Sequence, residues 1–196
     1  FASEDGEWCR LCNDEGNGLM GYETYVMKGL AEMYEVTSDP MYLERLAWHI
    51  DGVLTTRNDA RGVEDYRGDQ SACWIDTFYS GGEPYCWLTH SANIIKPFLM
   101  FADLVQRNQL DDELAYDGVS FAEKAEAYII AAEETVDYHD DQWGGGGNYL
   151  CRDDARACDW FAGWPLPLGM SARMDEVHYL LYDLTEEDWH LERAVA

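Results

Sequence analysis

The chain has 196 residues, of which 47% are hydrophobic and 14% aromatic, and 39 acidic against 13 basic residues give it a net charge of −26. This length and composition exclude a disordered chain and predict a single globular domain over residues 1–196. The charge repels nucleic acid and anionic membranes, so neither is expected as a partner. No apolar run reaches the roughly 18–20 residues that a membrane span needs. So acidic a surface fits a saline environment, or simple solubility.

Six cysteines lie in irregular stretches rich in glycine and tryptophan, in three close pairs: Cys9 and Cys12, Cys73 and Cys86, Cys151 and Cys158. An even count beside loops favours disulfide bonds and an extracellular or secreted protein. Pairing of neighbours is the simplest of the 15 connectivities that six cysteines allow. The alternative is metal, because Cys9-x-x-Cys12 is half of a zinc site. No secretory leader opens the chain, so we expect any signal peptide to have been removed.

The first half of the chain predicts a loop segment over residues 1–19 and then a helical hairpin. Residues 22–37 carry apolar side chains at three-to-four spacing, and so do residues 41–54. Between them, "SDP" ends one helix and offers Ser38 or Asp39 as the cap of the next. Two helices joined by so short a link fold back on each other. Residues 55–88 lose the helical period and are predicted to be a long loop.

Helical spacing returns over residues 89–107, with Thr89 as a candidate cap. Pro97 lies inside this segment and predicts a kink or a later start. Ser120 and Glu123 form a capping-box pattern that opens a helix to about residue 138. Residues 139–167 are irregular again, and a helix over about 168–184 follows. Thr185 is the candidate cap of a last helix, so the fold class is all-α.

Two segments of the chain are similar to each other. Residues 34–47, "YEVTSDPMYLERLA", and residues 182–195, "YDLTEEDWHLERAV", share Tyr, Thr, Leu, Glu and Arg at matching positions. The pattern indicates repeated antiparallel αα-hairpins, with the repeat restarting near residue 168, although generic hairpin chemistry could give the same letters. Neighbouring repeats bury one another's faces. We therefore expect the chain to be a piece of a longer polypeptide, or its open edge to be covered by a partner or by self-association.

Three segments resemble α/α-toroid proteins, a group that includes polysaccharide lyases, glucuronyl epimerases and unsaturated-uronyl hydrolases. They are "GLAEMYEVTSDPMYLERLAWHIDGVL", "WLTHSANIIKPFLMFADLV" and "GWPLPLGMSARMDEVHYLLYDLT". The resemblance covers roughly residues 20–196 and implies a partial (α/α) toroid with long disulfide-bound loops. Two positions depart from the family pattern: Gly169 or Met170 stands where it has asparagine, and Ala92 where it has glycine.

The resemblance also implies a cleft where the loops enter the inner helices. Flat aromatic rings beside acids and amides are suited to holding sugars. The predicted substrate-binding residues are Glu23, Trp74, Trp87, Trp143, Trp160 and Trp164. The tryptophans could equally pack the long loops onto the core.

His90 is the main catalytic candidate, because it opens an inner helix and Asn93 follows on the same face. Abstracting a proton next to a uronate carboxylate needs a base and a donor that steadies the enolate-like charge. His90 with Tyr22 or Tyr149, Asn93 and Arg152 would supply these groups. Alternatively, His90 is a capping or packing residue.

Other acidic and basic residues leave further alternatives open. A hydrolase would use two carboxylates from Asp59, Glu64, Asp65, Asp69 and Asp76. Calcium could bind among Asp137, Asp140 and Asp141 or among Asp153, Asp154 and Asp159, although solvated charge is the simpler interpretation and no cofactor is otherwise expected. Arg57, Arg61 and Arg67 could clamp a carboxylate, but loop-holding ion pairs are favoured.

The sequence therefore favours a secreted glycan-active protein, a lyase or epimerase acting on uronate-containing polysaccharide. The alternative is a non-catalytic extracellular module that binds sugar or assembles with its own copies.

Overall fold

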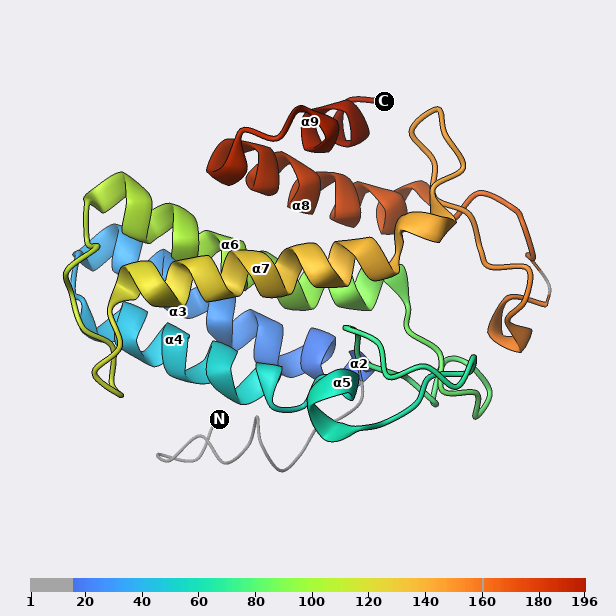
Figure 1. The fold of residues 1–196 in the computed structure, drawn as a ribbon, viewed down its shortest axis with the longest axis horizontal. Coiled ribbons are helices and arrows are strands. Elements are labelled where there is room, and N and C mark those ends of the chain that lie inside the picture. The colour runs from blue at the N-terminus through green and yellow to red at the C-terminus, as the bar shows by residue number, and fades with distance from the viewer. Residues whose placement is uncertain (1–15, 160) are drawn as a thin grey trace.

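The computed structural model describes residues 16–159 and 161–196, and it shows a helical protein (Figure 1). Within that part of the chain there is no strand, only four isolated β-bridges between loop segments. The all-α prediction is confirmed. The elements are α2 (Gly16–Gly18), the π-helix η1 (Leu19–Glu23), α3 (Thr24–Thr37), α4 (Met41–Leu54), α5 (Asn58–Arg61), α6 (Leu88–Asn108), α7 (Phe121–Tyr138), the 3₁₀ turns η2 (Asp140–Gln142) and η3 (Arg156–Cys158), α8 (Leu168–Thr185) and α9 (Asp188–Ala194).

The long helices form three hairpins, α3 with α4, α6 with α7, and α8 with α9. α6 also packs against α3 on one side and α8 on the other, so α3, α6 and α8 are neighbours in one row. These three helices all start at the end of the molecule that carries the long loops, and they run in the same direction (Figure 1). The partial toroid implied by the resemblance stays a prediction.

The core is centred on α6, which is covered by helices on several sides. Its buried residues include aromatic and branched side chains on more than one face, among them Phe98 and Phe101. Phe101 contacts Phe121 and Tyr128 of α7 through edge-on ring packing. Buried apolar area of this kind is the main stabilising contribution to a helical fold, at about 25 cal/mol per Å².

Most predicted helix limits agree with the structure. The predicted 41–54 helix has the bounds of α4, and the Ser120 capping box is present in both directions at the start of α7. Thr89 is not a cap, because α6 begins one residue earlier, after Trp87. α6 runs from Leu88 through Pro97, so the predicted later start is wrong. Residues 16–19, predicted as loop, belong to α2 and η1, and the rest of that loop lies outside the described residues.

The two similar segments form the same turn. Ser38 and Glu186 each adopt a left-handed conformation, with φ of 54° and 58°, and each donates its N–H to the carbonyl of the repeated tyrosine, Tyr34 or Tyr182. In both turns the repeated threonine donates its hydroxyl to the carbonyl four residues earlier. Thr185 therefore ends α8 and is not the N-cap of α9, a position that Glu187 occupies.

Two predicted disulfide bonds are present, Cys73–Cys86 and Cys151–Cys158. Each fastens one of the two long loops. Cys9 and Cys12 lie outside the described residues. None of the described helices is long and apolar enough to cross a membrane.

Candidate functional site

The long loops and the starts of three helices meet at one end of the molecule (Figure 1). A pocket of about 380 Å³ lies there. Its walls come from η1, from the loop before α6, and from the first turns of α6 and α8. The lining residues are Met20, Tyr79, Trp87, Thr89, His90 and Met170. Segments that are up to 150 residues apart in sequence thus form one cavity (170 − 20 = 150).

His90 is paired with a buried carboxylate behind the pocket. Its Nδ1 lies 3.2 Å from Oδ2 of Asp76, and the two side chains are 6% and 0% exposed. Within residues 16–159 and 161–196 neither atom has a well-aligned hydrogen bond. Because Nδ1 faces Asp76, Nε2 is the ring nitrogen left to exchange a proton with a bound molecule.

The loop around Asp76 fixes this carboxylate in place. Its Oδ1 accepts the backbone N–H groups of Phe78 and Tyr79, at 2.7 and 3.0 Å, while its own backbone pairs with Tyr85. Burial opposes ionisation of Asp76, but His90 and these N–H groups outweigh it and hold the pKa of Asp76 below its usual value.

Gly16 of α2 lies directly against the backbone of Trp74 and the side chain of His90. A Cβ at this position would lie 2.9 Å from the carbonyl oxygen of Trp74 and 3.4 Å from Nδ1 of His90. The N–H of Gly16 donates to the carbonyl of Ile75 at 2.7 Å. The backbone therefore approaches the Asp76–His90 pair more closely than any larger residue would allow.

The aromatic wall of the pocket is formed by the packed rings of Tyr79 and Trp87. The ring of Tyr79 lies 5.9 Å from that of His90, and the ring of Trp87 packs edge-on against Tyr85 at 4.8 Å. Across the described chain, no acceptor is bonded to the indole N–H of Trp87.

The predicted catalytic residues are not all at this pocket. His90 lines it, and Asn93 lies one turn further along α6, where its amide donates to the carbonyl of Thr89. Tyr22 is 63% exposed on η1. Tyr149 and Arg152 make their contacts elsewhere, so the structure separates the set that the resemblance implied.

Tyr149 belongs to a buried chain of polar groups between the second loop and the last hairpin. Its hydroxyl lies 2.7 Å from Nε2 of His178, whose Nδ1 lies 2.9 Å from Nδ1 of His190. Burial lowers the pKa of His178 to about 3 and that of His190 to about 4, so both are neutral. Tyr149 is 1% exposed, and its hydroxyl is occupied by this contact.

Two arginines hold the long loops in place. Arg152 fastens the second loop to the end of α7, since it donates to Asp141 at 2.7 Å and to the carbonyl of Tyr138 at 2.6 Å. Arg67 of the first loop bridges Asp141 and Asp154 of the second, each at 2.8 Å. These contacts agree with the loop-holding interpretation of the arginines, as do those of Arg57 with its two carboxylate partners, Asp59 and Glu134.

The predicted sugar-binding residues are also divided. Trp87 lines the pocket, and Trp164 is 67% exposed on the second loop. Trp74 is fully buried and donates to Thr56, so both of its ring faces are covered by protein. Glu23 is buried against Nδ1 of His49, and Trp143 lies under Arg193. Trp160 lies outside the described residues.

Two of the acidic residues that a hydrolase could use are bonded to other side chains. Asp59 is paired with Arg57, and Asp65 accepts from the Tyr138 hydroxyl at 2.9 Å. Glu64 and Asp69 are exposed. Over the described ranges, no three His, Cys, Asp or Glu side chains lie close enough together to hold a metal ion.

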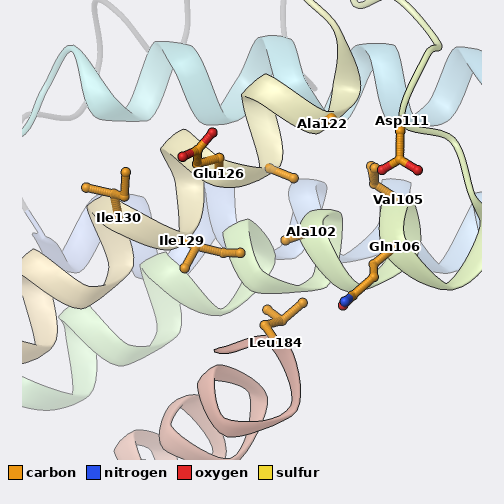
Figure 2. A pocket seen from close by; sticks show the side chains of 10 residues that line it. Ala102, Val105, Gln106, Asp111, Ala122, Glu126, Ile129, Ile130 and Leu184 are labelled. Carbon is orange, nitrogen blue, oxygen red and sulfur yellow. The ribbon is translucent and has the colours of Figure 1, made fainter. Parts of the chain in front are cut away.

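A second hollow, of about 290 Å³, lies between α6, α7 and the end of α8 (Figure 2). Apolar side chains from the three helices converge on it, with Gln106, Asp111 and Glu126 among its lining residues. The described residues that line it include no acid–base pair, so the Asp76–His90 pocket is the better candidate site.

The pairing of Asp76 with His90 was missed from the sequence, as were the roles of Met20, Tyr79 and Met170 in lining the pocket. Asp76 was considered only as a hydrolase carboxylate. Its contact with His90 depends on how the disulfide-bound loop folds back, and no local spacing in the sequence signals that.

Comparison of the chain with protein-family models, with curated proteins and with solved structures returns no match. The resemblance to α/α-toroid proteins therefore remains an expectation from sequence pattern.

Proposed function

We propose that the protein is a secreted glycan-active protein that holds a sugar ring in the pocket and uses His90 as the base of a lyase or epimerase reaction on uronate-containing chains. The observation that carries this proposal is the Asp76–His90 pair at the wall of an aromatic pocket. The two disulfide bonds are compatible with an extracellular setting.

In the proposed reaction, Nε2 of His90 takes the proton from the carbon next to the uronate carboxylate. The electron pair of that C–H bond moves into the carboxylate and gives an enolate-like intermediate. In a lyase, this pair then forms a C=C bond as the C–O bond to the neighbouring glycosidic oxygen breaks, and the leaving oxygen takes the proton that His90 had accepted. In an epimerase, a proton returns to the same carbon from the opposite face. Asp76 stabilises the imidazolium in either case.

The test incubates the protein with uronate polymers. A lyase should raise the absorbance at about 230 nm, where the unsaturated product of elimination absorbs. An epimerase should instead introduce deuterium from the solvent into the uronate. His90→Gln should lower the rate by about 10²–10⁴-fold, as expected for loss of a general base. Gln106→Ala, an exposed change far along α6, is the matched control and should keep the rate. Full activity in His90→Gln, or no activity in the native protein, would reject the catalytic proposal.

A non-catalytic sugar-binding module is the second candidate. It is favoured by exposed aromatic rings on the two long loops, namely Phe78, Tyr79, Phe161 and Trp164. In that case, oligosaccharides should bind without turnover, and Trp164→Ala should weaken binding. A self-assembling module would instead show concentration-dependent mass in light scattering.

A further inference from the structure

Two of the three lysines in the chain lie close together on the row of helices that starts at the pocket. Lys28 is on α3, Lys96 on α6 and Arg173 on α8. Glu176 of α8 joins two of them, at 2.8 Å from Lys96 and 3.4 Å from Arg173. We call Lys28, Lys96 and Arg173 the cationic cluster.

The cluster is open to solvent and is not fully neutralised. The side chains of Lys96 and Arg173 are 26% and 48% exposed. Lys28 is half-buried and makes no ion pair within the described residues. Burial lowers the pKa of Lys28, and the nearby charges of Lys96 and Arg173 lower it further, against the opposite effect of Glu176 and Glu32. Three cations thus lie together, beside Glu176 and Glu32, on a chain whose acids outnumber its bases by 39 to 13.

The cluster continues the pocket along the same helix faces. On α6, Thr89 lines the pocket, and Asn93 and Lys96 follow at four and seven residues, which places them on one face. At 1.5 Å per residue, Lys96 is about 10 Å beyond Thr89. On α8, Arg173 follows Met170 of the pocket wall by three residues. A ligand that reaches both places must be longer than one sugar ring.

We propose that the cationic cluster binds the carboxylate of an acidic sugar next to the unit held in the pocket, and so selects anionic glycans. This inference rests on the proposed function, because it assumes that the pocket holds a sugar. It also supplies the local attraction that a chain of net charge −26 needs to approach a polyanion. Among the described residues, no Lys or Arg lines the pocket itself.

The test measures binding of a uronate oligosaccharide and of a neutral oligosaccharide of equal length by calorimetry. Native protein should prefer the uronate chain, and the preference should fall with added salt. Lys96→Gln and Arg173→Gln should each weaken uronate binding about tenfold, the usual effect of losing a charged hydrogen bond. Glu176→Gln should strengthen it, because the competing carboxylate is gone. Arg107→Gln removes a cation further along α6 and should change nothing.

The outcomes separate the two proposals. If uronate binding follows the cluster variants while no turnover is seen, the cluster is supported and the catalytic proposal fails. If His90→Gln abolishes turnover but the cluster variants bind uronate as the native protein does, the cluster inference is overturned. Equal affinity for the neutral chain would also overturn it.

Discussion

At the scale of single residues, Gly16 packs so closely behind His90 that no side chain fits there. Gly16→Ala would place a methyl group 2.9 Å from the Trp74 carbonyl oxygen, which is backbone and cannot turn aside. We expect a loss of about 1–3 kcal/mol in the free energy of unfolding, together with weaker ligand binding at His90.

Gly29→Ala on α3 is the matched control, because no described atom outside the adjoining turns of α3 lies within 4 Å of the position that its added methyl group would occupy. This change should instead stabilise the protein, by about 0.5–1 kcal/mol, since alanine is the better helix former. Urea unfolding of both variants checks the pair. Equal stability of Gly16→Ala and the native protein would show that α2 has room to move away from the Trp74 carbonyl.

Buried neutral histidines make stability depend on pH. Burial lowers the pKa of His139 and of His178 to about 3, against about 6.5 for an exposed histidine. Below pH 6.5 the unfolded chain therefore binds protons that the folded chain does not. Each histidine should remove up to about 1.4 kcal/mol of stability per pH unit as pH falls from about 6.5 towards 4.

Asp175 acts in the opposite sense, because burial and Glu176 raise its pKa to about 6. The folded state then binds a proton first as pH falls below 6, which adds stability. Asp175→Asn should remove this effect and steepen the loss on acidification. Urea midpoints at pH 7.5, 6.5, 5.5 and 4.5 measure both slopes. If the urea midpoints of the native protein and of Asp175→Asn both stay constant from pH 7.5 to pH 4.5, the histidines are not buried in the neutral form.

At the scale of elements, each disulfide bond fastens one long loop, but only the first loop carries Asp76, the partner of His90. Cys73–Cys86 encloses Asp76 and ends four residues before His90. Replacing both cysteines by alanine should cost about 3 kcal/mol and weaken ligand binding. The Cys151→Ala, Cys158→Ala variant should cost slightly less and bind more nearly as the native protein does. Similar binding losses in both variants would show that the loops act together.

Local signals predicted the helices, while contacts between distant residues determined the site. The Ser120 capping box and the repeated turn at Ser38 and Glu186 follow from neighbouring residues, and the sequence located both. Thr89 and Thr185 have the right side chain for a cap, but the helix boundaries fall elsewhere. His90 was identified as the main candidate, but its partner depends on a loop whose path is set by tertiary contacts.

At the scale of the whole molecule, the excess of negative charge should make the fold sensitive to salt. A net charge of −26 destabilises the compact state through repulsion between like charges. Salt screens this repulsion, since the Debye length falls from about 30 Å at about 0.01 M to about 3 Å at about 1 M. We expect the melting temperature, followed by circular dichroism, to rise over this range of NaCl.

A charge-reversal variant separates repulsion from other effects of salt. Asp111, Asp112, Glu126 and Glu192 are exposed acids, and replacing all four by lysine changes the net charge from −26 to −18, since each substitution adds two units (−26 + 8 = −18). This variant should melt higher than the native protein at low salt and respond less to NaCl, because less repulsion remains to be screened. An equal salt response in both proteins would show that NaCl acts by strengthening apolar burial rather than by screening charge.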